Sequence, residues 1–224
     1  MRIQVFIPAF NEEGSIGGVV ERVRALYPSL EVIVIDDGSV DGTGSVARRS
    51  GATVVRHLVN LGGGAAVRTA FSLASIKGSD YAITFDGDGQ HDPSELSRFL
   101  DVIEREAPDV VIGTRFYEGG RIVMRGYRRY GIKFFSLFFS WLTKLELTDV
   151  TNCYRAYKVS AVKEVLGDLR EDQYYAIEIL GKVAGIGGKI VEVPVSDIMR
   201  TKGNSKKGIV SYFLNLSRVL LAGV

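Results

Sequence analysis

Two aspartates, Asp86 and Asp88, flank a glycine directly after the apolar run YAITF at Tyr81–Phe85. Because side chains alternate along an extended strand, both carboxylates are expected on the same side. At an effective dielectric near 20, two carboxylates about 5 Å apart repel each other by roughly 3 kcal/mol, so a proton or a cation has to offset the repulsion. Mg²⁺ or Mn²⁺ prefers such hard oxygen ligands and is commonly completed by waters and substrate phosphates. The pattern therefore predicts a divalent-cation site, which Gln90 and His91 are placed to extend.

A simpler interpretation of the same segment is a polar turn ahead of a helix. Asp92 precedes Pro93, and this pair is typical of a helix start. The Asp-x-Asp pattern by itself fits both interpretations. If it holds a metal, the ligand is expected to be a nucleotide diphosphate, because the cation neutralises charge that develops on a diphosphate leaving group.

Polar residues also follow the first two strand-like runs, as PAFNE at Pro8–Glu12 and DDGS at Asp36–Ser39. In open α/β sheets, ligands bind beyond the carboxyl ends of the strands. We expect a base pocket lined by Pro8, Phe10 and Glu12. Asp37 is expected to accept hydrogen bonds from ribose hydroxyls, as acidic residues do in dinucleotide sites. The alternative roles are structural, with helix caps or turn residues at Asn11, Gly38, Ser39 and Asp41.

Other chemistries have weaker signals. Asn60–Ala66 (NLGGGAA) resembles a helix start that cradles phosphate, but it lacks the GxGxxG spacing and the P-loop lysine. There is no GxSxG motif, and Cys153 has no obvious partner in either His57 or His91. Zinc-type ligand spacing is absent as well. These observations argue against hydrolases that use an activated nucleophile.

The elements that would position these residues alternate between apolar, β-rich runs and helical patterns, which is typical of a parallel sheet with helices on both faces. Strands are expected at Ile3–Ile7, Glu31–Ile35, Thr53–Arg56, Tyr81–Phe85, Asp109–Ile112 and Lys189–Val193. Helices are expected at about Glu13–Leu26, Gly42–Ser50, Gly64–Ser75 and Pro93–Glu106, with a Phe-rich helix and a closing helix in the second half. The sequence predicts a Rossmann-like α/β fold with a looser C-terminal extension.

Composition sets broader limits. The 224 residues, 46% of them hydrophobic, are enough to bury a full core. The single cysteine excludes an internal disulfide, and no charged and apolar leader precedes Ile3, so a reducing, cytoplasmic setting is expected. The net charge of +2 says little about partners, and nucleic acid is not expected among them.

Basic residues gather in two stretches that are candidates for phosphate contacts. The first holds Arg115, Arg121, Arg125, Arg128, Arg129 and Lys133 against one acid, Glu118. The second holds Arg200, Lys202, Lys206 and Lys207. The alternative is that these side chains are ordinary solvated surface residues.

No run reaches the roughly 18 to 20 apolar residues that a spanning helix needs, so the chain is not expected to cross a bilayer. Ile132–Leu142 and Ile209–Val224 are shorter, and runs of this length are usually core helices. The alternative is a helix that lies in the membrane interface, which the clustered Phe and Trp beside arginines and lysines support.

Four motifs, in this order, resemble glycosyltransferase family 2: IPAFNEE at Ile7–Glu13, DDGSVDGT at Asp36–Thr43, FDGDGQHDP at Phe85–Pro93 and IGTRF at Ile112–Phe116. Two later motifs, EVPV at Glu192–Val195 and RTKGNSK at Arg200–Lys206, resemble the branch that makes polyprenyl (dolichyl) phosphate sugars. The similarity runs over nearly the whole chain.

The resemblance implies a GT-A type fold in one catalytic domain, residues 1–224, with a nucleotide-sugar-binding half at 1–113 and an acceptor-side half at 114–224. It implies inverting transfer of mannose or glucose, from GDP-mannose or UDP-glucose, to a polyprenyl phosphate, with Mg²⁺ or Mn²⁺ as cofactor. The implied nucleotide-sugar-binding residues are Pro8, Phe10, Glu12, Ile35, Asp37, Asp86 and Lys206, and the implied metal ligands are Asp86, Asp88 and Gln90. The implied catalytic residues are Asp88, Arg115, Arg128 and Arg200, with Arg115, Arg128 and Ser205 on the acceptor phosphate.

Further partners follow from a lipid acceptor, namely peripheral contact with the cytoplasmic face of a membrane and an integral-membrane partner subunit. The sequence departs from the family pattern at Ile132, where a serine is frequent, and at Asn152-Cys153, where Ser-Gly is common. Two other functions stay open. A hydroxyl acceptor would need a base, for which Glu171-Asp172 is the candidate pair, and a non-catalytic subunit would bind the nucleotide sugar without transferring it.

Overall fold

A seven-stranded sheet runs through the computed structural model, which describes residues 1–117, 126–166, 175–196 and 198. The strands are β1 (Ile3–Ala9), β2 (Glu31–Asp36), β3 (Thr53–Arg56), β4 (Tyr81–Thr84), β5 (Val110–Thr114), β6 (Arg155–Lys158) and β7 (Ile190–Pro194). Their order across the sheet is β3-β2-β1-β4-β6-β5-β7. All neighbours are parallel except at β6, which is antiparallel to both β4 and β5.

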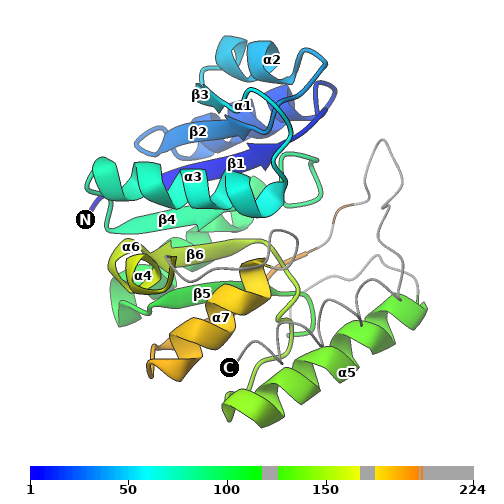
Figure 1. Cartoon of the computed structure of the whole chain (residues 1–224), viewed down its shortest axis with the longest axis vertical. Helices are drawn as coiled ribbons and strands as arrows, with labels where there is room; N and C mark the ends of the chain where they lie inside the picture. Colours follow the sequence, from blue (N-terminus) through cyan, green and yellow to red (C-terminus); the bar gives the residue numbers. More distant parts are fainter. Residues whose placement is uncertain (118–125, 167–174, 197, 199–224) are drawn as a thin grey trace.

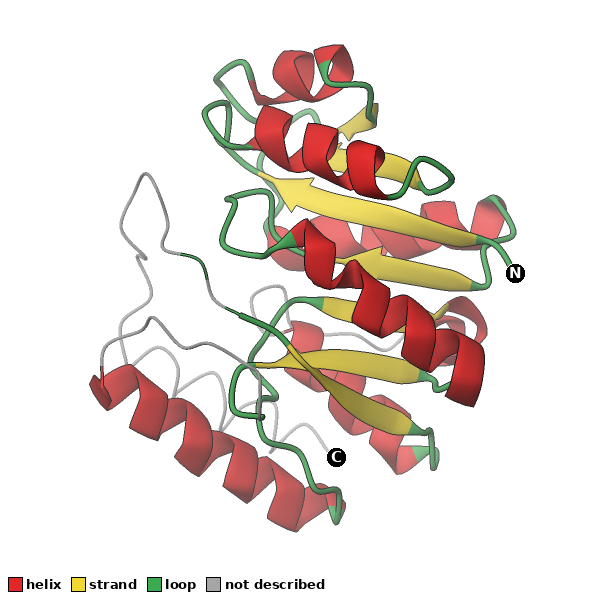
Figure 2. Ribbon diagram, turned by 180° about the vertical axis from the view of Figure 1, so that it is seen from behind, coloured by secondary structure: helices red, strands yellow, loops and turns green. Residues whose placement is uncertain are grey.

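Helices cover both faces of this sheet, as the two opposite views in Figures 1 and 2 show. They are α1 (Ile16–Leu26), α2 (Thr43–Arg49), α3 (Gly63–Ile76), the short 3₁₀ helix η1 (Pro93–Glu95), α4 (Leu96–Glu106), α5 (Gly126–Thr143), α6 (Val159–Leu166) and α7 (Tyr175–Gly185). In the part of the chain that the structure describes, no helix is both long enough and apolar enough to cross a membrane. The arrangement is a GT-A type α/β fold.

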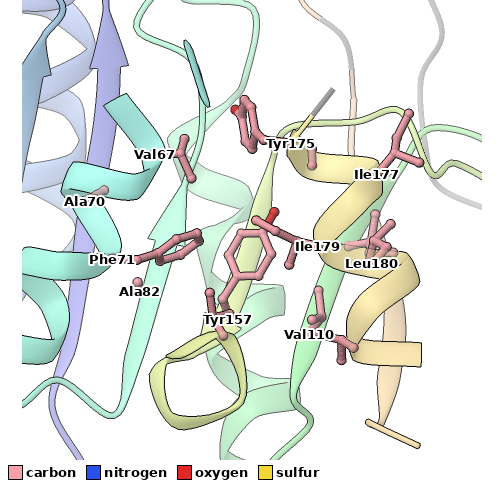
Figure 3. Close-up of a cluster of buried hydrophobic side chains, with 14 of the residues drawn as sticks. Val67, Ala70, Phe71, Ala82, Val110, Tyr157, Tyr175, Ile177, Ile179 and Leu180 are labelled. Atoms are coloured by element: carbon pink, nitrogen blue, oxygen red, sulfur yellow. The ribbon is translucent and has the colours of Figure 1, made fainter. Parts of the chain in front are cut away.

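Alternation along β1 explains why two cores form. Phe6 faces a cluster built with α3, α6 and α7, whereas Val5 and Ile7 face a second cluster built with α1, α2 and α4. In the first cluster the ring of Phe71 meets the ring of Tyr157 edge to face, with 5.0 Å between centroids (Figure 3). Because both faces are buried, β1, β2 and β4 are nearly continuous apolar runs, as expected for parallel strands.

The predicted mainly parallel sheet with helices on both faces is confirmed, and the six expected strands lie within two residues of those observed. Three elements were not predicted from the sequence. One is β6, a four-residue strand inserted antiparallel between β4 and β5. The others are α6 and α7, whose apolar residues contribute to the first core. The Phe-rich segment is helical, but its helix begins earlier than expected, at Gly126. The closing helix at 209–224 lies outside the described residues.

The turn after β2 depends on Gly38. Its φ of +72° lies in the left-handed region, and a Cβ added there would come within 2.4 Å of the carbonyl carbon of Val59. The turn therefore packs directly against the backbone that leads into Asn60–Ala66.

We expect Gly38→Ala to destabilise the protein more than Gly78→Ala does. Gly78 has a similar φ of +67°, but a Cβ there would meet nothing within 4 Å, so its replacement should cost only the conformational term of about 1 to 2 kcal/mol. The difference between the two free energies of unfolding, measured with urea, isolates the contact with Val59. Equal losses would contradict this account of the turn.

Candidate functional site

Parallel pairing places the ends of β1, β2 and β4 at one edge of the sheet. Ala9 pairs with Asp36, and Phe6 pairs with Thr84, so the loops that leave the three strands emerge together. The segments PAFNE, DDGS and DGDGQ, which the sequence analysis selected separately, are therefore neighbours in space.

Side chains join the loops after β1 and β2. The Asn11 amide donates to Ser39 Oγ at 3.0 Å, the Val40 amide donates to Asn11 Oδ1 at 3.0 Å, and the Glu12 amide donates to Thr43 Oγ1 at 2.8 Å. The alternative prediction of N-caps is wrong for Asn11 and Ser39, because the N-cap positions of α1 and α2 are Ser15 and Gly42, whereas the Asp41 carboxylate does accept from the amide of Thr43, the first residue of α2, at 2.9 Å. These polar residues cross-link two loops instead, since loops at a sheet edge lack ladder partners for their amides.

Asp37 holds the glycine-rich segment. Its Oδ1 accepts from the Leu61 amide at 3.0 Å and lies 2.7 Å from His57 Nδ1, and its Oδ2 accepts from the Gly62 amide at 2.8 Å. A carboxylate has about four acceptor positions, so three are used within the protein. The predicted contact with ribose hydroxyls would have to use the remaining position, and Asp37 at the same time fixes the start of α3.

Asp86 and Asp88 project from a turn that is fixed to β1. Gly87 donates its amide to the Pro8 carbonyl at 3.3 Å and accepts from Ser15 Oγ at 3.0 Å. A Cβ on Gly87 would meet Ile16 Cδ1 at 3.0 Å, so a side chain between the two aspartates would require its neighbours to shift by a few tenths of an ångström. Both carboxylates are partly exposed, whereas Asp36 and Asp37 are buried.

The residues of this turn suit a hard divalent cation. Asp88 Oδ1 accepts from the Gln90 amide at 3.0 Å, which keeps Gln90 in the same turn as both carboxylates. Two carboxylates and an amide oxygen are ligands that Mg²⁺ and Mn²⁺ accept, with waters and phosphates completing the shell. Among the described residues, no group of three or more His, Cys, Asp or Glu side chains is placed to hold a metal ion, so Asp86 and Asp88 would need Gln90, waters and substrate phosphates to complete a shell. The helix-cap interpretation is confirmed for Asp92, whose carboxylate accepts from the Ser94 amide at 2.9 Å, whereas the metal site stays a prediction.

His91 lies beneath this turn. Its ring centroid is 5.1 Å from that of Tyr154 and 6.4 Å from that of Phe85. Burial, followed by the charge of Arg115, lowers the pKa of His91 to about 3. The ring is therefore neutral near pH 7 and packs among aromatic side chains, and a place in a metal shell stays a prediction.

Arg115, at the end of β5, forms a two-point ion pair with Asp149. Its Nε lies 2.6 Å from Asp149 Oδ2, its Nη2 lies 2.9 Å from Oδ1, and Nη2 also donates to Thr151 Oγ1 at 3.1 Å. The Asp149 side chain is fully buried and the Arg115 side chain is 10% exposed. This geometry fixes the plane of the guanidinium, so Arg115 is held rigidly where β5 leaves the sheet.

Two further charged residues hold the loop that carries Asp149. The Glu192 carboxylate on β7 accepts from the amides of Thr148 and Asp149, both at 2.9 Å, and burial raises the pKa of Glu192. Arg155, which is fully buried, donates to the carbonyls of Val150 and Asn152 at 2.6 Å and to that of Ala176. No role was predicted from the sequence for Asp149, Glu192 or Arg155, although Asp149 and Arg155 lie within a few residues of Asn152-Cys153 and Glu192 begins EVPV.

The remaining predicted site residues differ in their exposure and in whether the structure describes them. Pro8, Phe10 and Glu12 lie at the shared edge, and Phe10 is exposed. Ile35 is different, because its side chain is fully buried in the first core, so only its backbone is available to a nucleotide. Arg128 lies on α5, but its side chain is not among those described, and Arg200, Ser205 and Lys206 lie outside the described residues, as does Glu171-Asp172.

Comparison with known proteins gives consistent results. The sequence model described as Glycosyl transferase family 2 matches residues 4–166. The chain is 33% identical to the undecaprenyl-phosphate mannosyltransferase of Micrococcus luteus, over 92% of this chain and 87% of that protein. It is 31% identical to the polyprenol monophosphomannose synthase of Mycolicibacterium smegmatis, over 92% and 80%.

Among solved structures, glucosyl-3-phosphoglycerate synthase from Mycobacterium tuberculosis, in complex with Mn²⁺, UDP and glucosyl-3-phosphoglycerate, is similar to the chain with a TM-score of 0.72. The similarity covers 99% of this chain and 78% of that one, at 22% identity. At this level of identity the comparison supports the fold alone.

We expect Asp149→Asn to lower the free energy of unfolding by about 3 kcal/mol, because it leaves the buried guanidinium of Arg115 without its anion. Glu106→Gln is the control, since Glu106 pairs with Arg105 and Lys189 at the surface and each such pair contributes at most about 1 kcal/mol. In a double-mutant cycle with Arg115→Met, the double variant should lose less stability than the sum of the two single variants. Strictly additive losses would show that the pair is not energetically coupled.

Proposed function

The chain belongs to glycosyltransferase family 2, and from that premise we propose that it transfers a hexose from a nucleotide diphosphate sugar to a polyprenyl phosphate, with inversion at the anomeric carbon. The observation that carries the proposal is the gathering of the loops after β1, β2 and β4, with the partly exposed Asp86 and Asp88, at one edge of the sheet. The names of the relatives, one an undecaprenyl-phosphate mannosyltransferase and one a polyprenol monophosphomannose synthase, support the acceptor class.

On the donor side, the proposed nucleoside contacts are Pro8, Phe10, Glu12 and Asp37, with the backbone of Ile35 behind them and Lys206 from the later motif. Asp86, Asp88 and Gln90 would hold Mg²⁺ or Mn²⁺, and the structural neighbour that contains Mn²⁺ and UDP supports use of a divalent cation. When bound, the cation stabilises negative charge on the departing diphosphate.

On the acceptor side, the phosphate of a polyprenyl phosphate is already ionised near neutral pH. One of its oxygens attacks the anomeric carbon, the bond from that carbon to the diphosphate oxygen breaks, and the electron pair leaves with the nucleoside diphosphate. The protein then needs no base, only groups that neutralise and align two phosphates. We assign that role to Arg115, Arg128, Arg200 and Ser205. The bidentate contact with Asp149 would orient Arg115 for it.

The direct test incubates the protein with Mn²⁺, a polyprenyl phosphate in detergent, and separately labelled GDP-mannose or UDP-glucose, and follows label into the organic phase. We expect transfer from one of the two donors, and mannose is the sugar that the relatives' names favour. Metal-dependent release of nucleotide without lipid product would point to a hydroxyl acceptor. Metal-dependent binding without release would point to a non-catalytic subunit.

We expect Asp88→Asn to lower transfer by at least 10³-fold while the protein stays folded, because several kcal/mol of transition-state stabilisation depend on the metal site. Asp101→Asn, the same change at an exposed position of α4, is the control and should leave the rate unchanged. Rates and thermal unfolding are measured on the same preparations. A full rate in Asp88→Asn would refute the metal assignment.

A lipid acceptor also predicts contact with a membrane surface, and α5 offers a face for it. Tyr130, Phe134, Leu137 and Trp141 recur at helical spacing and are 62% to 75% exposed, while Phe135 and Phe139 of the same helix are buried. Arg129 and Lys133 are exposed beside them. Aromatic and aliphatic side chains next to cations are typical of helices that lie in the interface of an anionic bilayer. Peripheral association is thus part of the proposal, while a cytoplasmic location and an integral-membrane partner stay predictions.

We expect wild-type protein to sediment with anionic vesicles at low salt, and the double variant Phe134→Glu/Trp141→Glu to stay largely in the supernatant. Each glutamate removes apolar contact and adds repulsion from anionic lipid. Ile76→Glu is the control, because Ile76 is 82% exposed but ends α3 on another part of the molecule. Equal sedimentation of wild type and double variant would remove α5 from the membrane contact.

A further inference from the structure

The segment that leaves β7 is held by contacts that the transfer mechanism does not use. The Val195 amide donates to the Thr114 carbonyl at 2.8 Å, which is the last ladder-like contact with β5. After it, the Ser196 amide donates to both carboxylate oxygens of Glu95, at 3.1 and 3.0 Å, and the Ile198 amide donates to the Gln90 carbonyl at 2.9 Å. The exit of β7 is therefore joined to the loop that carries Asp86, Asp88 and Gln90.

Glu95 is built into this junction. It ends η1, directly after the Asp92 cap and Pro93, and its side chain is 9% exposed. Arg98 Nη1 donates to Glu95 Oε1 at 3.2 Å and to the carbonyl of Pro194, the last residue of β7, at 2.6 Å. Arg98 thus binds the end of β7 at Pro194, and Glu95 binds the backbone at Ser196. Burial raises the pKa of Glu95, because a carboxylate withdrawn from water is less stable in its charged form.

The contacts have a physical reason. Beyond Val195, no carbonyl of β5 accepts from an amide of the described residues, and an amide withdrawn from water needs an acceptor. The Glu95 carboxylate supplies that acceptor from the segment that follows the DGDGQ turn, and Gln90 supplies the next one from the turn itself. The β7 exit is therefore fixed relative to the turn, while the turn itself is held by Pro8 and Ser15.

We infer that Glu95 is a positioning residue, whose carboxylate fixes the exit of β7 against the donor-side turn and so sets where the chain that continues toward Arg200 starts. Glu95 itself touches no substrate group in this assignment. The expected effect of Glu95 on catalysis rests on the proposed function. The contacts of Glu95 with the β7 exit do not depend on which acceptor the protein uses.

The test compares Glu95→Ala, Glu95→Gln and the control Glu104→Ala, an exposed glutamate of α4. In the full-length protein, Glu95→Ala should raise hydrogen exchange at the amides of Ser196 and Ile198, lower kcat of transfer by about 10- to 100-fold, and change the Mn²⁺-dependent Kd of the nucleoside diphosphate less than threefold. Glu95→Gln keeps one acceptor for the Ser196 amide and should recover most of kcat. Glu104→Ala should match the wild type in every measurement.

Three results would overturn the inference: unchanged exchange at Ser196 and Ile198 in Glu95→Ala, faster exchange with wild-type kcat, or a parallel loss of nucleotide affinity and kcat that Glu95→Gln does not reverse. If Glu95→Ala fails to fold, Ser196→Pro removes the same amide donor while keeping the carboxylate, and it should reproduce the loss of kcat. If the wild type transfers no sugar to polyprenyl phosphate, the proposed function fails, whereas the exchange measurement still decides whether Glu95 holds the β7 exit.

Discussion

The pairing of β1 with two parallel neighbours, β2 and β4, is the constraint on which the candidate site depends. Parallel strands end at the same edge, so the loops after all three strands have to share one small region of space. The amides of Asn11, Glu12 and Val40 lie beyond the strand pairing, and polar side chains from the adjoining loop supply their acceptors. The parallel pairing therefore explains why polar residues follow each of these three strands.

Buried carboxylates and partly exposed carboxylates have different roles in this molecule. Asp37, Glu95 and Asp149 are buried, and each accepts from backbone amides or from an arginine, which compensates for the loss of water. Asp86 and Asp88 are partly exposed on a turn whose glycine is pressed against β1. Buried carboxylates hold loops in place, and the partly exposed pair is the one suited to a ligand.

The second half of the chain is joined to the first through β5, β6 and β7. Arg115 leaves β5, its partner Asp149 precedes β6, and Glu192 on β7 holds the Asp149 loop. The same strand, β7, then leads to the junction with Glu95 and Gln90. Residues assigned to the acceptor and residues assigned to the donor are thus connected by short hydrogen bonds through one edge of the sheet, while α5 presents an aromatic face to the outside.

Much of the donor half could be predicted from the sequence. Parallel strands buried on both faces are continuous apolar runs, so β1, β2 and β4 and the polar segments after them were visible without a structure, as were Asp86, Asp88 and Asp37. The residues that hold the site could not be predicted in the same way. Asp149 reaches Arg115 across 34 residues, and Glu95 reaches Ser196 across 101. The burial of His91 was equally invisible in the sequence.

The physical reason is the range of the interactions. Hydrophobic alternation and turn chemistry act between residues a few positions apart, so the sequence by itself determined the parallel sheet, its edge and the types of side chain that stand there. Whether a carboxylate at that edge faces solvent or a buried amide depends on which distant segments pack against it. Only the tertiary structure decided that Asp37 also holds the glycine-rich segment, that Arg115 is fixed by Asp149, and that the exit of β7 is held against the DGDGQ turn.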